Sequence, residues 1–203
     1  MNLTEVDGIY VEEGELVLRR HDADSSGAWR TTVYNGALVR YWEDYTVETW
    51  FMDSRQHNTA DTQGIIARWQ GSIPAFESDG EGYVAQHQGE SDGPGSIQIV
   101  RDLVRAGSDN DVLGSEPLSA SLESGQWYRL KFTLEGPDLT AEIFREDGTR
   151  LGSVAVSDTT YDSGSAGLRA RMTFHGRETY FSGLAVTGET PEIPGDSRSP
   201  VLG

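Results

Sequence analysis

A stretch of strict two-residue alternation near the C-terminal end constrains the fold of this chain most. Between Gly164 and His175, every second residue is apolar: Ala166, Leu168, Ala170, Met172 and Phe174. The residues between them are Gly167, Arg169, Arg171, Thr173 and His175. A period of two is that of a β-strand with one apolar and one polar face. The stretch predicts a half-buried strand whose polar face, with the strands beside it, meets any ligand.

Further strand-like segments follow one another along the whole chain. They are rich in β-branched and aromatic residues and lie at 8–20, 45–52, 64–70, 82–88, 96–102, 126–134, 139–144, 151–156 and 180–186. Turn residues separate them, as at Gly136-Pro137-Asp138 and Glu146-Asp147-Gly148. Residues 106–118 are expected to be loop. The spacing predicts an all-β sandwich over residues 1–187, followed by a Pro/Gly-rich tail or linker over residues 188–203.

The chain is strongly acidic, with 33 Asp and Glu against 16 Lys and Arg and a formal net charge of −17. Lys131 is the only lysine. Such a charge disfavours nucleic acid and anionic membrane as partners. The carboxylates either cluster as cation ligands or spread over the surface to keep the protein hydrated in high salt. Scarce lysine favours the second interpretation, a halophilic protein.

Several other classes of site lack support in the sequence. The chain has no cysteine, which excludes disulfides and thiolate metal sites. No apolar run is long enough to cross a membrane, so we expect no membrane insertion. The N-terminal residues lack a signal-peptide pattern. No phosphate-binding glycine loop precedes a helix, and no His/Asp group has zinc spacing.

Seven segments follow one another in an order known from one fold family. They are residues 45–51, 64–68, 82–86, 125–136, 139–143, 161–170 and 180–186. Together, over roughly residues 5–187, they resemble a concanavalin A-like, laminin G-type jelly roll. The resemblance implies a two-sheet antiparallel sandwich with a concave face that often binds glycans. Because this family includes lectins, carbohydrate-binding modules, hydrolases, lyases and scaffold domains, the fold leaves the function open.

The resemblance also implies, in many members, a structural calcium ion. Glu5, Asp7 and Asp44 are the carboxylates expected near neighbouring strand ends. Relatives commonly carry an Asp near the position of Ser182, and the serine here puts that ligand in doubt. Calcium requires six to eight oxygen ligands, so its binding stays an open alternative.

Strand alternation gathers polar side chains on one front, with Tyr83 and His87 on the opposite face of their strand unless a bulge exchanges the two. Aromatic planes with hydrogen-bonding side chains suit sugars, which present C–H faces and hydroxyls. Trp127 is expected in the core, and a single polar residue on a sheet is more often simply solvated. The expected glycan-binding residues are Trp50, Arg68, Trp69, Gln86, Gln98, Arg169, Arg171 and His175.

Enzymatic interpretations find weaker signals. A glycoside hydrolase needs a carboxylate pair across the sugar bond, but Glu48 stands alone and Glu142 has only Glu146 and Asp147 nearby, in a turn. A polysaccharide lyase needs a neutralising group and a Tyr or His base. Arg68, Tyr83, Gln86, His87 and His175 offer those residue types. The Gln86-His87-Gln88 segment is only faintly similar to the Gln-x-His strand of alginate lyases.

The first hypothesis is therefore a non-catalytic, glycan-binding domain that mediates attachment or adhesion outside the cell in high salt. Weak single sites would call for a homo-oligomer or larger assembly, held through the C-terminal tail. The second hypothesis is a structural subunit of a virion or cell surface, such as a fibre, turret or surface-layer component, without sugar binding. The third is a polysaccharide lyase acting on an acidic glycan.

Overall fold

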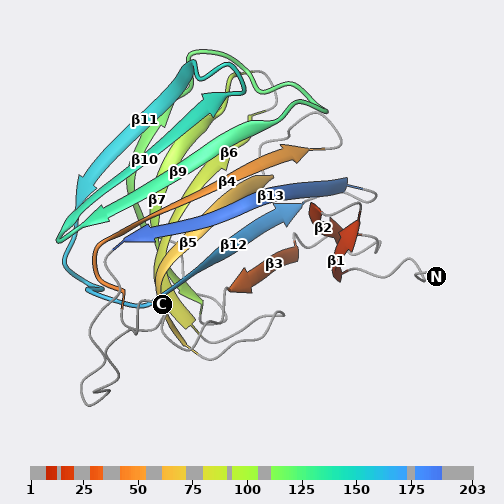
Figure 1. Cartoon of the computed structure of the whole chain (residues 1–203). Coiled ribbons are helices and arrows are strands. Elements are labelled where there is room, and N and C mark those ends of the chain that lie inside the picture. The colour runs from red at the N-terminus through yellow and green to blue at the C-terminus, as the bar shows by residue number, and fades with distance from the viewer. Residues whose placement is uncertain are drawn as a thin grey trace, which may run out of the picture.

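A computed structural model gives the architecture of the chain (Figure 1). It describes residues 8–12, 15–20, 28–33, 42–53, 61–71, 80–90, 93–104, 111–172 and 177–188. Outside this range lie the predicted calcium ligands Glu5 and Asp7. The predicted glycan-binding residue His175 and the C-terminal tail after Gly188 also lie outside it. No helix in the described part of the chain is long and apolar enough to cross a membrane.

The described residues form thirteen β-strands. These are β1 (Gly8–Glu12), β2 (Glu15–Arg20), β3 (Ala28–Val33), β4 (Tyr45–Asp53), β5 (Thr62–Gly71), β6 (Gly80–Gln88), β7 (Ser96–Val104), β8 (Asp111–Pro117), β9 (Tyr128–Glu135), β10 (Asp138–Arg145), β11 (Arg150–Ser157), β12 (Ser165–Met172) and β13 (Arg177–Gly188). The loop expected at 106–118 is wrong over β8. This strand lacks an apolar alternation because it lies at a sheet edge and is mostly exposed.

Two antiparallel sheets pack face to face, as Figure 1 shows. The seven-stranded sheet has the order β1-β2-β13-β4-β9-β10-β11, and the six-stranded sheet has the order β3-β12-β5-β6-β7-β8. Neighbours far apart in sequence, such as β4 and β13, come together by crossovers. The all-β, two-sheet jelly roll expected from the sequence is confirmed.

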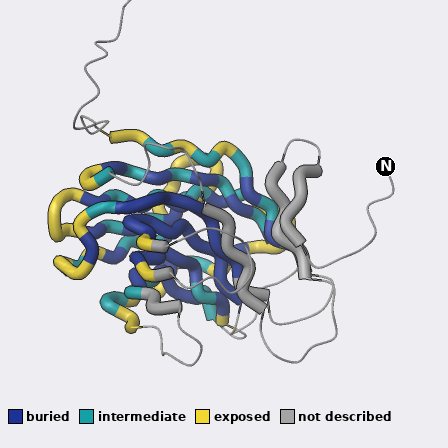
Figure 2. Tube along the Cα trace, turned by 90° about the horizontal axis from the view of Figure 1, so that it is seen from below, coloured by how far each residue is buried: buried dark blue, intermediate teal, exposed yellow. Residues whose placement is uncertain are grey.

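The core lies between the sheets, and each strand turns alternate residues toward it. In β4 the burial alternates along the whole strand, with Val47 and Phe51 fully covered. Phe132 on β9 and Ile65 on β5 meet them in the same cluster. Each such side chain contributes about 1.5–3 kcal/mol by leaving water. Figure 2 shows buried stretches along the strands and exposed ones at the turns.

Strand β12, within the alternating stretch of the sequence, lies between β3 and β5. Ala166, Leu168 and Ala170 are buried in the inter-sheet core, as the alternation predicts. Gly164, just before the strand, has a φ of +147°, and a Cβ there would lie 2.4 Å from the carbonyl carbon of Arg68. The approach of β5 at this point therefore requires glycine.

A β-bulge in β5 overturns the expected face of Arg68. The register with β6 shifts between Ala67 and Gln70, and Arg68 adopts a φ of +47°. Arg68 thereby turns toward Tyr45 and Tyr161 of the inter-sheet core rather than to the outer polar front. The next residue, Trp69, packs with the outer-face residues of the six-stranded sheet. The extra residue of a bulge exchanges the faces that simple alternation assigns.

Candidate functional site

Three of the predicted glycan-binding residues do line up in one row across the six-stranded sheet. Arg169 on β12 pairs with Gly64 on β5, which pairs with Gln86 on β6, which pairs with Gln98 on β7. The Gln86 amide donates to Gln98 Oε1 at 3.2 Å. All lie on the outer face, away from the core. Sequence alternation thus placed these three side chains together.

The row is largely covered. Gln86 is only 5% exposed and Arg169 only 4%. Beside them on the same face, Ile66, Trp69, Val84 and Val100 form a second buried apolar cluster. The indole of Trp69 lies against Gly82, where a Cβ would approach its ring at 3.1 Å. Solvent reaches the row mainly at its β7 end, where Gln98 is partly exposed.

Arg68 serves as an internal clamp. Its side chain is 2% exposed and donates from Nε and Nη2 to Glu43 O, at 3.0 and 2.8 Å, and from Nη1 to Tyr161 O at 3.0 Å. Its own backbone N–H donates to the Tyr45 hydroxyl at 2.6 Å. The guanidinium therefore ties two connecting segments to β5, and its donors point at the protein's own carbonyls.

The other predicted ligand residues lie apart from the row. Trp50 is on β4, in the opposite sheet, and its side chain faces outward and is partly exposed. Arg171 belongs to β12, but its side chain, like all of His175, lies outside the described residues. The structure therefore does not gather the eight expected residues on one surface.

The residue types of the lyase hypothesis are engaged in internal contacts. The His87 ring is 1% exposed, stacks on Phe51 with centroids 6.4 Å apart, and places Nδ1 3.0 Å from Gln63 Oε1. The Tyr83 hydroxyl donates to Asp158 at 2.5 Å. Burial, reinforced by Asp158, raises the pKa of the Tyr83 phenol, opposite to what a catalytic base needs. The described structure brings these groups to no common open site.

His87 is part of a polar network between the sheets. Gln63 donates to Asp53 Oδ2 at 2.7 Å, and the Thr179 hydroxyl donates to Asp53 Oδ1 at 2.6 Å. All four side chains are buried. Because buried polar groups need partners, the network joins β4 and β13 to β5 and β6 in a defined arrangement.

Asp44 fits a calcium site poorly. Its Oδ1 accepts the backbone N–H of Gly136 at 2.7 Å and lies 3.4 Å from Arg68 Nη2. A guanidinium at that distance competes with a metal ion for the carboxylate. Within the residues that the structure describes, no group of three His, Cys, Asp or Glu could hold a metal. Calcium binding stays a prediction resting on residues outside that range.

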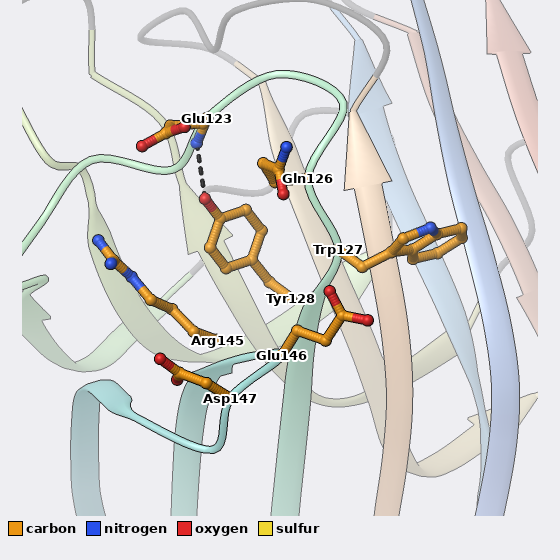
Figure 3. Close-up of a pocket in the computed structure, with 7 residues that line it drawn as sticks. All are labelled: Glu123, Gln126, Trp127, Tyr128, Arg145, Glu146 and Asp147. Atoms are coloured by element: carbon orange, nitrogen blue, oxygen red, sulfur yellow. Dashed lines mark hydrogen bonds between the residues drawn. The ribbon is translucent and has the colours of Figure 1, made fainter.

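An open hollow lies at another place, where β9 begins and β10 ends (Figure 3). Its volume is about 460 Å³. It is lined by the 119–127 connection, the start of β9 and the turn after β10, namely by Glu123, Gln126, Trp127, Tyr128, Arg145, Glu146 and Asp147. Figure 3 shows Tyr128 in the middle, Glu123 and Gln126 on one side, and Arg145 and Asp147 on the other.

Local structure holds the walls of this hollow in place. The Tyr128 hydroxyl accepts the backbone N–H of Glu123 at 2.8 Å, which fixes the connection over the ring. Across the hollow, Asp147 accepts the backbone N–H of Thr149 at 2.8 Å, and this bond lowers the pKa of the Asp147 carboxyl. The turn is thus pre-formed, with Gly148 at φ +84° completing it.

The hollow combines an aromatic floor with charged walls. Tyr128 is buried and Trp127 partly exposed, whereas the other five lining residues are exposed. Three carboxylates, from Glu123, Glu146 and Asp147, stand against the one guanidinium of Arg145. Such a surface can accept hydrogen bonds from hydroxyls and stack against an apolar ring face, and it disfavours anions.

Sequence reasoning missed this hollow, although a signal was present. Trp127 was expected in the core, and Glu146 and Asp147 were expected in a turn near Glu142. The turn at Gly136-Pro137-Asp138 fixes an antiparallel register in which Tyr128 pairs with Arg145. Counting outward from that turn would have placed the aromatic pair beside the charged turn.

No family model and no curated protein matches the sequence. Solved structures do share the fold. Carbohydrate-binding module CBM66 from Bacillus subtilis has a TM-score of 0.62 at 12% identity, over 90% of this chain and 92% of the module. Lotus tetragonolobus seed lectin has a TM-score of 0.60 at 15% identity, over 90% of this chain and 92% of the lectin. A legume lectin-like domain from Entamoeba histolytica has a TM-score of 0.60 at 10% identity, over 88% of this chain and 86% of that domain. The fold is that of the concanavalin A-like jelly rolls.

Proposed function

We propose that this jelly roll is a non-catalytic carbohydrate-binding domain and that the hollow beside Tyr128 is its sugar site. The observation that carries the proposal is the lining of the hollow: two adjacent aromatic residues, one guanidinium and three carboxylates around about 460 Å³. This size suits a small ligand, and most ligand sites pair apolar surface with a few placed polar groups.

Each part of the lining has a role in this proposal. The buried Tyr128 ring closes the floor of the hollow, and the partly exposed Trp127 at its rim receives the C–H face of a sugar. Sugar hydroxyls donate to the carboxylates of Glu123, Glu146 and Asp147, and charge-assisted bonds of this kind are the stronger ones. Arg145 donates to ring or hydroxyl oxygens. Because carboxylates dominate, the site favours neutral sugars over uronates, which also argues against a lyase of acidic glycans.

The shared fold supports the proposal in general terms, because neighbours named as a carbohydrate-binding module and as lectins adopt it. We further propose that the domain works at a cell or particle surface in high salt. The net charge of −17 supports this setting. At molar salt the Debye length falls to about 3 Å, which screens the self-repulsion of the surface. Adhesion through several weakly binding copies would follow from such display.

The test is binding of a neutral and acidic glycan array in molar salt, followed by titration calorimetry with matched variants. Arg145→Ala should weaken sugar binding about 10-fold or more, because a charged hydrogen bond contributes about 1.5–3 kcal/mol. Arg150→Ala is the control, since this arginine is also exposed and on the same hairpin but does not line the hollow. Glu146→Gln and Glu135→Gln form a second pair, because Glu135 is exposed at the far end of β9.

An array without any bound sugar would overturn the proposal and would favour a structural subunit of a virion or cell surface instead. Equal losses in Arg145→Ala and Arg150→Ala would place the sugar elsewhere. The row of Gln86, Gln98 and Arg169 is then the next candidate, and Gln98→Ala, at its exposed end, tests it directly.

A further inference from the structure

We infer that the hollow is one end of a longer binding surface, which continues across the outer face of the seven-stranded sheet and takes a glycan chain rather than a single sugar. This inference rests on the proposed function of the hollow. The continuation is the outer apolar patch, which we define as the aromatic residues Trp50, Trp127, Phe144 and Tyr180 together with Met52.

The strand register places the first part of the patch. On the outer face, Ser182 of β13 pairs with Trp50 of β4, Trp50 pairs with Arg129 of β9, and Arg129 pairs with Phe144 of β10. Burial alternates along β4, β9 and β10, and these residues belong to the partly exposed set. They therefore form one row on the solvent side of the sheet.

A second row joins this one to the hollow. Tyr180 pairs with Met52 on β13 and β4. The register Phe51 to Tyr128 and Tyr128 to Arg145, extended by one residue, brings Met52, Trp127 and Glu146 side by side. Trp127 and Glu146 also line the hollow. In Figure 3 the Trp127 indole points away from the Tyr128 ring, so it can belong to both surfaces.

All five members of the patch are partly exposed. Gly183 has a φ of +61°, and a Cβ there would lie 3.6 Å from Cδ1 of Trp50. The glycine therefore adds no side chain beside that edge of the indole. The rows cross four strands, β13, β4, β9 and β10, and at about 4.8 Å per strand they span about 14 Å. This is longer than one sugar ring.

The polar groups within the patch suit a glycan chain better than a plain apolar partner. The Arg129 guanidinium lies 4.6 Å from the centre of the Phe144 ring and 3.9 Å from Glu48, so it is held among the aromatic side chains. The guanidinium covers one face of Phe144, so this row offers a fixed donor beside the Trp50 ring and the Ser182 hydroxyl position. Successive sugar units present the same alternation of C–H faces and hydroxyls.

The experiment measures affinity against chain length with neutral gluco-, manno- and galacto-oligosaccharides, by calorimetry in molar salt. Affinity should rise from the monosaccharide to longer chains. Trp50→Ala should leave monosaccharide affinity unchanged and weaken the longest chain about 10-fold. Thr46→Ala, on the same face of β4 but away from the patch, should change neither.

Several results would overturn the inference. Affinity independent of chain length, or equal effects of Trp50→Ala on short and long sugars, would leave a single-sugar hollow and refute the patch. If no sugar binds at all, the proposed function itself fails. As a second measurement that needs no variant, the backbone amide of Gly183 should shift in NMR spectra with a long chain but not with the monosaccharide, and its failure to shift with any chain would also refute the patch.

Discussion

Replacement of Arg68 by leucine tests whether this buried guanidinium is a structural clamp rather than a sugar ligand. Leucine keeps an apolar stem of similar reach near Cβ but removes the guanidinium, with all three of its donor nitrogens. The carbonyl of Glu43 then loses two bonds and the carbonyl of Tyr161 loses one. The Asp44 carboxylate, 64% exposed, loses only a long contact of 3.4 Å.

The cost follows from the two carbonyls. A hydrogen bond to a charged group contributes about 1.5–3 kcal/mol, so two carbonyls left without their donor would lower the free energy of unfolding by about 3–6 kcal/mol. Glu43 is exposed, so water replaces most of its share, whereas the bond to Tyr161 is buried. We therefore expect a loss of about 2–4 kcal/mol. With a urea m-value of about 2 kcal/mol/M, the unfolding midpoint falls by about 1–2 M.

The assay is urea unfolding followed by tryptophan fluorescence at fixed salt, with Arg150→Leu as control. The Arg150 side chain is 59% exposed and, among the described residues, pairs with Glu142 at the surface, so its loss should cost less than about 1 kcal/mol. Arg68→Lys should fall between the two, because a single ammonium cannot reach both carbonyls. An Arg68→Leu variant as stable as the control, or one that is stable but loses sugar binding, refutes the clamp.

Three further predictions concern stability. Gly164→Ala should lower the free energy of unfolding by about 3 kcal/mol or more, because the backbone conformation and the contact with Arg68 both exclude a Cβ. Gly125→Ala, at φ +74° in open space, should lower it by about 1 kcal/mol. Equal urea midpoints for the two variants would contradict this. Asp53→Asn places an amide NH2 against one of the two buried donors, Gln63 or Thr179. It should lower the free energy of unfolding by about 2 kcal/mol and Tm by about 4–8 °C. An unchanged Tm in calorimetry would contradict the inter-sheet network. Burial, with a nearby carboxylate, raises the pKa of Tyr161 to about 12. The neutral Tyr161 phenol therefore contributes its full stabilisation below about pH 10, and this contribution is lost as the pH rises toward the folded-state pKa. Absorbance titration of the folded protein tests this, and a Tyr161 titration at about pH 10 would contradict it.

Alternation in the sequence predicted the parts of the fold that follow a period of two without interruption. Leu168 and Arg169 point to opposite faces of β12, and Gln86 and Gln98 share one face, as expected. The same reasoning failed at Arg68, because a bulge adds one residue and exchanges the faces, and no residue type in that segment announces a bulge.

The candidate site was less predictable than the fold, for a geometric reason. A period of two separates the faces of one strand but does not say which of two sheets the strand joins. Alternation alone therefore allows Trp50 to share a face with Gln86, although Trp50 lies on the other sheet. The hollow arises where a connection, a strand start and a turn meet, and such meetings depend on register between β9 and β10 rather than on any local pattern.

The place of β13 in the seven-stranded sheet has a consequence for the way the chain folds. This strand lies between β2 and β4, so its partners are made long before it. Until Arg177–Gly188 is available, β2 and β4 are held apart and each presents an unpaired edge. Pairing over such long sequence separations slows folding and leaves the nascent chain open to association with its neighbours. We therefore expect refolding from urea to be slow and to lose yield as protein concentration rises.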